Sequence, residues 1–309
     1  MSHFEILLVA LVLDAVLGEP DWLWSRVPHP VKLIGQGVDW LDKRMNGDDL
    51  RKTAGVVMIF GLIVVSWIAG SILAWLPDYG LLELIGCAVL LSFKSLIEHV
   101  RTVLTALPNG IEAARAEVAK IVGRDTDELD ESGVSRAAIE SGAEGFCDGV
   151  VGPVFWFMLF GLPGILVYKV VNTADSMVGH LDEKYTEFGW GTAWADTILN
   201  WIPARVAGVL IAAASMRREP FETMIEDADL HRSINAGWPE AAMASTLNIA
   251  LSGPRSYGGV STREPFINSS GRRDLVANDI EDAIAVLWKA WFCLLGFIGV
   301  ITIFFWLIF

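Results

Sequence analysis

Long apolar runs alternate along the chain with shorter stretches rich in charges, glycine and proline. Two of these runs, 54–76 and 286–309, are long enough for the about 20 apolar residues that a helix needs to cross a hydrocarbon core, so both are predicted to be transmembrane helices. A shorter run, 81–93, follows a tight turn and is predicted to return across the membrane as the second arm of a hairpin. The opening run, 6–17, has neither the basic residues nor the cleavage site of a signal peptide, so it is predicted to be a retained short helix.

The apolar run 150–171 is interrupted by helix-breaking residues, namely Gly152, Pro153, Gly161, Pro163 and Gly164. A re-entrant pair of half-helices fits this pattern better than one continuous span. Irregular backbone at membrane depth is tolerated where protein or a wet cavity satisfies its polar groups, so this segment is expected to line a cavity. The run 202–216 is too short to assign and fits either a core helix or part of a span.

Basic residues flank the apolar runs on one side only, and cytoplasmic loops carry the excess of lysine and arginine. The loops 18–53, 94–148 and 172–285 are therefore predicted to face the cytoplasm, on the strength of Lys43, Arg44, Arg51, Lys52, Lys94, Arg101 and Lys289. The predicted fold is a single all-α polytopic membrane domain over 1–309, with about four to six membrane helices or re-entrant segments.

Composition supports the membrane assignment, because 53% hydrophobic and 19% charged residues are too apolar for an ordinary soluble chain of this length. The formal net charge of -14 offers no electrostatic surface for a polyanion, so nucleic acid is not expected as a partner. The three cysteines lack CxxC spacing, which indicates neither a disulfide framework nor a thiolate zinc site.

Three candidate site residues lie near the first apolar run. Asp14 falls inside the run, where a carboxylate is costly unless it faces a cavity or a partner, and Glu19 follows at the run's end. His29 stands between two prolines that restrain its backbone and aim its side chain. An ordinary acidic helix end and a surface histidine remain as alternatives.

A helix predicted to start at Ser132 places Arg136, Glu140 and Glu144 on one stripe, with Asp148 just beyond its end. Carboxylates that converge on a glycine-broken apolar hairpin suit magnesium, which prefers oxygen ligands. From spacing alone, a salt-bridged surface helix explains the pattern better.

Lys169, Asn172, Asp175 and Ser176 share one face of another predicted helix, directly after the broken apolar run. An ammonium, an amide, a carboxylate and a hydroxyl are expensive to bury together without a purpose, so we interpret this face as a binding or catalytic surface.

A third group lies further along the chain. The Asn235 to Glu240 turn leads into an apolar helix, and a glycine-rich loop that contains Arg255 and Tyr257 follows it. Glycine lets backbone amides approach a phosphate, and arginine adds a charge-assisted bond, although such loops are often plain turns. The sequence contains no Walker A, GxGxxG or HExxH motif that would identify a nucleotide or metal site.

In combination, these segments resemble the CobD/CbiB family of cobalamin biosynthesis proteins. The resemblance rests on Leu13-Asp14, Gly18-Glu19-Pro20, Pro28-His29-Pro30-Val31, Gly123-Arg124-Asp125-Thr126, Arg136 to Ser141, Asp148-Gly149-Val150-Val151, Tyr168-Lys169, Asn172-Thr173, Asp175-Ser176-Met177, Asp196, Asn200, Pro203-Ala204-Arg205, Asn235 to Ala241 and Gly253-Pro254. The chain departs from the family's pattern at Gly145, Gly152 and Ile234, where asparagine, alanine and proline are expected. The Gly145 departure leaves room for a divergent paralogue such as the AmpE-type membrane signalling proteins.

The resemblance implies ATP-dependent and Mg²⁺-dependent condensation of adenosylcobyric acid with (R)-1-aminopropan-2-ol or its O-phosphate. The product would be adenosylcobinamide or its phosphate, made in the cytoplasmic (inner) membrane with membrane lipid and other cobalamin-pathway enzymes as neighbours. The role assignment is our own inference from residue chemistry. Glu140, Glu144, Asp148 and Asp175 are expected to share the metal, Lys169 and Arg205 to steady phosphate charge, and His29 to act as base.

The other expected binding residues are Asn172, Ser176, Asn235, Glu240, Arg255, Tyr257, Asp14 and Glu19. A magnesium-dependent intramembrane transferase remains an alternative, although Asp175 has no acidic residue four positions later. A non-enzymatic transporter or signalling protein is a second alternative, and the concentration of polar motifs on the predicted cytoplasmic side disfavours it.

Overall fold

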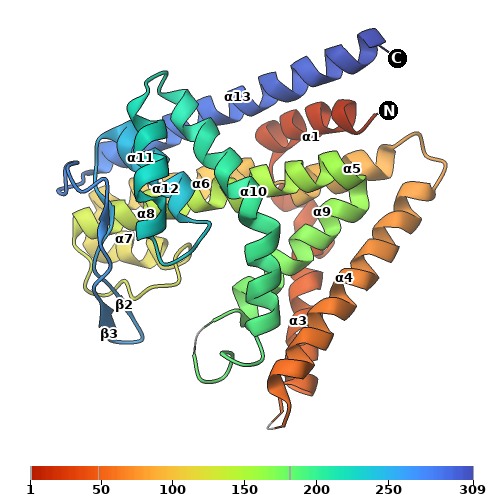
Figure 1. The fold of residues 1–309 in the computed structure, drawn as a ribbon, viewed down its shortest axis with the longest axis horizontal. Coiled ribbons are helices and arrows are strands. Elements are labelled where there is room, and N and C mark those ends of the chain that lie inside the picture. The colour runs from red at the N-terminus through yellow and green to blue at the C-terminus, as the bar shows by residue number, and fades with distance from the viewer. Residues whose placement is uncertain (1, 48, 181, 309) are drawn as a thin grey trace. The chain divides into compact units, whose positions relative to one another are not determined.

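The apolar runs fold into helices in the computed structural model, which describes residues 2–47, 49–180 and 182–308. The helices of the first half are α1 (His3–Leu17), α2 (Asp21–Trp24), α3 (Pro30–Met45), α4 (Arg51–Trp75), α5 (Leu81–Leu90), α6 (Phe93–Ala106), η1 (Leu107–Asn109), α7 (Ile111–Val118) and α8 (Glu131–Phe146). The later elements are η2 (Cys147–Val151), α9 (Gly152–Val178), α10 (Trp190–Ala214), α11 (Glu219–Asp227), η3 (Ala228–Leu230), α12 (Gly237–Leu247), the strands β1 (Leu251–Ser252), β2 (Arg255–Tyr257), β3 (Val260–Thr262) and β4 (Phe266–Ile267), and α13 (Ala277–Ile308). Figure 1 shows this all-α architecture.

Four helical segments within the described residues are long and apolar enough to cross a membrane: Arg51–Trp75, Glu131–Val178, Trp190–Ala214 and Ala277–Ile308. The predicted helices 54–76 and 286–309 are confirmed as helices, except that Phe309 lies outside the described residues. The predicted short helix near the start is present as α1. The run 81–93 is helical as α5 only as far as Leu90, and its return across the membrane stays a prediction, because α5 is not among the candidate spans of the described residues. The protein is a polytopic all-α membrane protein.

The helix α10 corrects the prediction of one continuous loop from 172 to 285, because it lies inside that stretch and is itself a candidate span. The run 202–216, which the sequence left unassigned, forms the second half of α10 as far as Ala214. The signal was weak because Asp196 and Asn200 interrupt the apolar pattern before Pro203.

The helix α9 is broken at Gly161, whose φ of 62° and ψ of -147° are not helical. A Cβ atom at Gly164 would lie 2.2 Å from the Trp156 carbonyl oxygen, so the backbone after the break packs closely on the segment before it. The predicted pair of half-helices is thus confirmed at this position, and the bend is visible in Figure 1.

The chain divides into two compact units, each assembled from separate stretches. The first unit contains Met1–Ser92, Asp148–Asn200 and Ile298–Phe309, and the second contains Phe93–Cys147 and Trp201–Phe297. The single-domain assignment over 1–309 stays a prediction.

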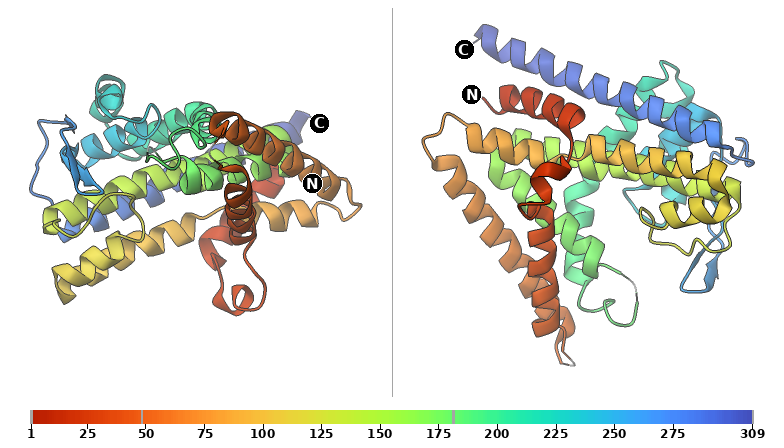
Figure 2. Two further views of the ribbon diagram at one scale, coloured as in Figure 1. Left: turned by 90° about the horizontal axis from the view of Figure 1, so that it is seen from below. Right: turned by 180° about the vertical axis from the view of Figure 1, so that it is seen from behind.

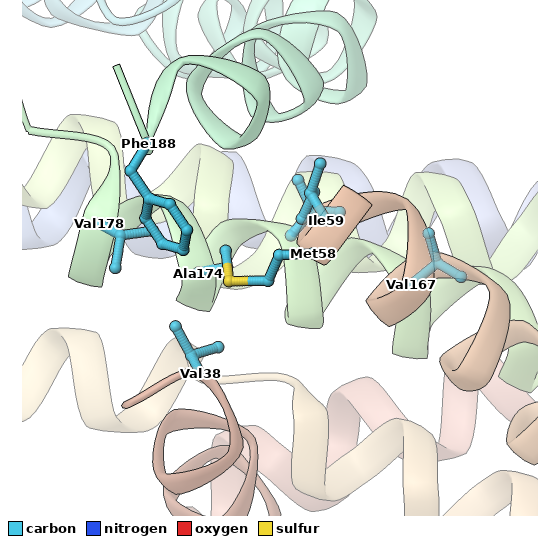
Figure 3. Packing of buried hydrophobic residues seen from close by; sticks show 8 residues of the cluster. Val38, Met58, Ile59, Val167, Ala174, Val178 and Phe188 are labelled. Atoms are coloured by element: carbon cyan, nitrogen blue, oxygen red, sulfur yellow. The ribbon is translucent and has the colours of Figure 1, made fainter. Parts of the chain in front are cut away.

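In the first unit, α3 and α4 pack against the second half of α9, and Figure 2 shows α3 and α4 running side by side. Val38 from α3, Met58 and Ile59 from α4, and Ala174 from α9 lie in one buried cluster with Phe188 (Figure 3). Burial of these apolar side chains stabilises the contact of α3 and α4 with one face of α9, and the polar residues of α9 lie on another face.

In the second unit, α8 packs against α6, α7 and α12. Its N-cap is Asp130, whose carboxylate accepts the Gly133 amide at 2.7 Å, so α8 begins at Glu131, one position before the predicted start at Ser132. The Ser132 hydroxyl instead donates to the Arg273 carbonyl and accepts from the Leu275 amide. Two antiparallel strand pairs, β1 with β4 and β2 with β3, follow α12.

Candidate functional site

The first candidate site is a network of polar side chains in the first unit, which we call the α9 network: Asp148, Tyr168, Asn172, Asp196 and Asn200. The Asn172 side-chain amide donates to Asp148 Oδ2 at 3.1 Å and to Asp196 Oδ1 at 3.3 Å. The Asn200 amide donates to Asp196 Oδ2 at 3.0 Å and accepts from the Tyr168 hydroxyl at 2.8 Å. Asn172 therefore holds two carboxylates from different segments on one nitrogen atom.

Local geometry explains why Asp148 reaches this network. It lies in η2, a π-helical turn between α8 and α9, and such turns are frequently found at functional sites. Gly152 follows directly, and a Cβ atom there would lie 2.2 Å from the Tyr168 hydroxyl. The glycine thus gives the Tyr168 ring room to point toward Asn200.

Lys169 is the buried cation of this unit, with 8% of its surface exposed. Within the part of the chain that the structure describes, its ammonium group makes no hydrogen bond and no ion pair within 4 Å. The carboxylates that act on it electrostatically are those of Asp148, Glu19 and Asp14. Lys169 precedes Asn172 by three residues on α9 and so faces the same side of the helix.

Three predicted residues near the start of the chain, Asp14, Glu19 and His29, interact electrostatically with Lys169. Asp14 is buried near the end of α1, whereas Glu19 is exposed. His29 is the N-cap of α3, and its Nδ1 atom accepts the Val31 amide at 3.2 Å. Burial lowers the pKa of His29 below its ordinary value, Lys169 acts in the same direction, and Glu19 acts against both.

Asp175 and Ser176 lie one turn further along α9. Asp175 is half-buried, and a Cβ atom at Gly179 would lie 2.0 Å from its Oδ1 atom, so the glycine leaves space for the carboxylate. The exposed Ser176 hydroxyl donates to the Asn172 carbonyl at 3.0 Å. The predicted face from Lys169 to Ser176 is therefore a real helical face.

The second candidate site is in the second unit and is centred on Glu140, which is buried in α8. We call it the Glu140 cluster: Glu140, Arg124, Arg255 and Glu264. Arg124 donates to Glu140 Oε2, and the Ser252 amide donates to Glu140 Oε1. Arg255 lies 3.6 Å from Glu140 Oε2 and 3.3 Å from Glu264 Oε2. Two arginines and two carboxylates thus pair inside the unit, which is how buried charge is normally compensated.

Glu240 and His231 form a buried pair beside this cluster. The Nε2 atom of His231 lies 3.5 Å from Glu240 Oε1, and His231 Nδ1 accepts the Ser233 amide at 3.0 Å. Burial raises the pKa of Glu240 well above its ordinary value, and the like charges of Glu140 and Glu144 raise it further. Burial lowers the pKa of His231, and Arg255 lowers it further. Both groups therefore favour their uncharged forms.

Three other predicted residues of the second unit, Arg205, Tyr257 and Asn235, are not members of the Glu140 cluster. Arg205 stacks its guanidinium on the rings of Trp201 and Trp238, at 4.1 Å and 4.4 Å from their centroids. Tyr257 stacks against Arg232 at 4.3 Å, and Asn235 is buried just before α12.

The glycine-rich loop forms the β2–β3 hairpin, and its turn amides are already occupied. Asp125 accepts the Gly258 amide at 3.0 Å, the Gly259 amide at 2.8 Å and the Ser256 hydroxyl at 2.7 Å. These hydrogen bonds, led by that of Gly259, lower the pKa of Asp125. The expectation that these amides face a phosphate is corrected here, since a carboxylate of the chain takes that place.

The four predicted metal ligands are divided between the two units, with Glu140 and Glu144 in one and Asp148 and Asp175 in the other. Among the described residues, no group of three or more histidine, cysteine or acidic side chains is arranged to hold a metal. Both Glu140 oxygens accept hydrogen bonds, and Glu144 is exposed. A magnesium site stays a prediction.

Residue chemistry alone assigned no site role to several residues that complete these sites, namely Tyr168, Asp196, Asn200, Arg124, His231, Ser252 and Glu264, although Tyr168, Asp196, Asn200 and Arg124 are among the residues that carry the family resemblance. For Asp196 and Asn200 a signal existed: they stand four residues apart, on one helical face, inside an otherwise apolar run. For Arg124 and Glu264 no local signal existed, because their partners lie far away in the sequence.

Comparison with known proteins places the chain in a family. The family model described as "CobD/Cbib protein" matches residues 7–287. A protein of Sinorhizobium sp named "Cobalamin biosynthesis protein CobD" is 48% identical over 310 residues, covering 95% of this chain and 96% of the relative. Proteins of the same name from Rhizobium meliloti (strain 1021) and Brucella suis biovar 1 (strain 1330) are 47% and 43% identical, and each alignment covers at least 92% of both chains. No solved structure matches the chain significantly. With a match of this extent and relatives of this similarity, the chain belongs to the CobD/Cbib protein family.

Proposed function

We propose that this protein is a ligase of cobalamin biosynthesis that joins adenosylcobyric acid to (R)-1-aminopropan-2-ol or its O-phosphate, using ATP. Relatives that carry the name of a cobalamin biosynthesis protein support the pathway. The observation that carries the chemistry is the buried ammonium of Lys169 close to the α9 network, since a lysine without an ion pair is ready to receive an anion.

The proposed reaction proceeds through an acyl phosphate. A carboxylate does not condense with an amine at neutral pH, so an oxygen of the corrinoid carboxylate attacks the γ-phosphorus of ATP and ADP leaves. The amine nitrogen then attacks the acyl carbon, inorganic phosphate leaves with the bonding electrons, and the ammonium proton of the intermediate passes to a base.

Lys169 is proposed to hold the transferred phosphoryl group, with Asn172 and Ser176 as polar neighbours on α9. Mg²⁺, when bound, neutralises charge on the phosphoryl oxygens. Its oxygen ligands are proposed on the first unit, where Asp148 and Asp175 flank Lys169 along the chain. Because both oxygens of Glu140 are engaged, we now propose that Glu140 positions Arg124 and Arg255, and that Glu144 contributes charge to the surroundings.

His29 is proposed as the base, and the structure defines what this role requires. Because Nδ1 accepts the Val31 amide, the neutral ring carries its proton on Nε2. His29 accepts a proton only after the Val31 hydrogen bond opens. Its lowered pKa keeps the ring neutral at pH 7, which a base needs.

The remaining predicted residues are proposed to bind substrate. Asp14 and Glu19 contribute negative charge near Lys169 for the amine, whereas Arg205, Asn235, Glu240, Arg255 and Tyr257 serve substrate binding in the second unit. We propose that the protein lies in the inner membrane with its functional loops in the cytoplasm, where ATP is present. Membrane lipid and other enzymes of the pathway are its proposed neighbours.

The test uses purified protein in detergent with adenosylcobyric acid, ATP, Mg²⁺ and either aminopropanol or its phosphate. We expect mass spectrometry to show an amide product and one ADP per product. Reactions without ATP, without the amine or with protein carrying Lys169→Met serve as controls. ATP-independent product, or no product with either amine, would refute the ligase assignment and favour an AmpE-like signalling role or a different transferase.

A further inference from the structure

The two aspartates joined by Asn172 have the geometry of a cation site. The distances from the Asn172 nitrogen to Asp148 Oδ2 and Asp196 Oδ1 are 3.1 Å and 3.3 Å, so these two oxygens are at most about 6.4 Å apart. A magnesium ion sits about 2.0–2.1 Å from its ligands and keeps several waters, so it can bind one carboxylate directly and the other through water.

The hydrogen bonds leave the Asp196 carboxylate with capacity to bind a cation. Each oxygen of Asp196 accepts one amide hydrogen bond, from Asn172 or from Asn200, and each carboxylate oxygen offers about two lone pairs. Neither amide carries charge. Among the described residues no lysine, arginine or histidine forms an ion pair with Asp196, so uncharged amides hold its carboxyl group in place.

Lys169 provides a cationic group on α9, the helix of Asn172, which joins this pair of aspartates. It is more than nine-tenths buried on the same face of α9 as Asn172, and its ammonium group makes no hydrogen bond or ion pair with the described residues. Asp148 is the carboxylate that acts on it most strongly. An ammonium that lies near the Asp148 carboxylate, yet beyond ion-pair distance of it, suits a ligand that carries both charges, such as a phosphate group with its divalent cation.

We propose that Asp148 and Asp196 together bind the divalent cation of a phosphate ligand, that Asn172 and Asn200 position the two carboxylates, and that Lys169 binds the phosphate. Asp196 thereby joins the site from α10, and Asp175 is not required as a metal ligand. This inference rests on the proposed function for the identity of the phosphate, which would be that of ATP, whereas the cation site itself does not depend on the reaction.

The first experiment measures Mn²⁺ binding to the purified full-length protein by electron paramagnetic resonance, with and without ATP. We expect ATP to tighten Mn²⁺ binding at least about tenfold in the wild type. Asp196→Asn and Asp148→Asn should each weaken Mn²⁺ binding about tenfold or more, and Lys169→Met should remove the effect of ATP. Asp39→Asn, at a solvent-accessible carboxylate of α3, is the matched control and should bind as the wild type does.

The second experiment uses only the wild-type chain, so it does not depend on whether a variant folds. Fe²⁺ replaces the ion, and ascorbate with peroxide generates radicals that cut the backbone near the metal. We expect cuts near residues 148, 172 and 196, mapped by mass spectrometry. Cuts confined to the surroundings of Glu140 and Glu144, or wild-type Mn²⁺ affinity in folded Asp196→Asn, would overturn the proposal.

The outcomes separate this site from the proposed function. Mn²⁺ binding that requires Asp148 and Asp196, without any amide product, would keep the cation site and reject the ligase. Amide synthesis that survives Asp196→Asn with unchanged Mg²⁺ dependence would keep the ligase and reject the site. Failure of the wild type to bind Mn²⁺ with ATP present would overturn the cation site.

Discussion

A buried ammonium without an ion pair is destabilising, and Lys169 therefore gives the most direct test at the scale of single residues. Lys169→Arg keeps the positive charge but replaces a compact ammonium with a planar fork that does not fit a shaped phosphate site. We expect turnover to fall at least about tenfold, equivalent to about 1.4 kcal/mol of transition-state stabilisation. Steady-state kinetics of the purified variant measure this, and Lys289→Arg, at an exposed position of α13, should keep normal turnover. Near-normal rates for Lys169→Arg would remove Lys169 from the chemistry.

Asp175 provides a second residue test, and it separates the original metal assignment from the Asp148 and Asp196 pair. If Asp175 is a metal ligand, Asp175→Asn abolishes activity while membrane insertion and thermal stability stay close to those of the wild type. If the cation lies on Asp148 and Asp196 alone, the Asp175→Asn protein keeps its Mn²⁺ affinity. Activity at saturating Mg²⁺, measured together with Mn²⁺ binding, distinguishes the two cases.

The buried carboxyl of Glu240 predicts a pH dependence of stability. Its pKa in the folded protein is raised well above 4.5, so its contribution to stability is fully present below about pH 4.5 and is lost as the pH rises toward the folded-state value. Glu240→Gln mimics the protonated carboxyl and removes this loss. We expect the Tm of Glu240→Gln to exceed that of the wild type by a margin that grows from pH 5 to pH 8.

The control for this experiment is Glu219→Gln, at an exposed carboxylate near the start of α11. Its Tm should follow the wild-type curve in parallel across the same range. A constant difference between Glu240→Gln and the wild type at every pH would contradict the assignment of an uncharged Glu240.

At the scale of elements, the break in α9 depends on one glycine. The φ and ψ of Gly161 fall in a region that is essentially reserved for glycine, and a Cβ atom there would also approach the His3 ring at 2.8 Å. Gly161→Ala should destabilise the protein by about 1–3 kcal/mol. Thermal unfolding in detergent measures the loss, and Gly37→Ala, in the open interior of α3, should be neutral or stabilising by up to about 1 kcal/mol. Equal Tm values for Gly161→Ala and the wild type would contradict the break.

The helix α10 shows how packing decides an element that the pattern leaves open. Its sequence places Asp196, Asn200 and Pro203 within an apolar stretch, which weakens any periodic signal. In the fold, Asp196 and Asn200 bond to each other, to Asn172 and to Tyr168. Asp196 and Asn200, which weaken the apolar pattern of α10, are therefore the residues whose hydrogen bonds hold α10 against α9.

At the scale of the whole molecule, the proposed orientation in the membrane is testable by cysteine labelling. Cys293 is exposed, so the background carries Cys293→Ala, while Cys87 and Cys147 are buried. Ser176→Cys and Gly258→Cys introduce exposed thiols before and after α10, and both positions are cytoplasmic only if α10 does not cross the membrane. Tyr79→Cys introduces a thiol into the turn predicted to lie outside.

We expect an impermeant maleimide to label only Tyr79→Cys in intact cells and all three variants after permeabilisation. Ready labelling of Ser176→Cys from outside would reverse the topology, whereas labelling of Gly258→Cys alone would show that α10 crosses the membrane. Labelling of Ser176→Cys would also place the α9 face where ATP is absent.

The sequence alone determined the features that depend on neighbours along the chain. Apolar runs longer than a bilayer's hydrocarbon core predict spans, and glycine and proline inside such a run predict its break, because both effects act within one or two turns of backbone. The same local periodicity put Lys169 and Asn172 on one helical face.

Only the tertiary structure decided which polar groups meet. Glu140 and Asp148, eight residues apart on neighbouring turns, were predicted to share a metal, yet Glu140 pairs with Arg124 and Arg255, and Asp148 pairs with Asn172. Their true partners come from distant segments, and the directions of those segments are fixed by the packing of many apolar side chains. Periodicity indicates which face of a helix a residue occupies, but it carries no information about the neighbouring helix. For that physical reason, the contact between Asp196 and Asn172 could be found only in the fold.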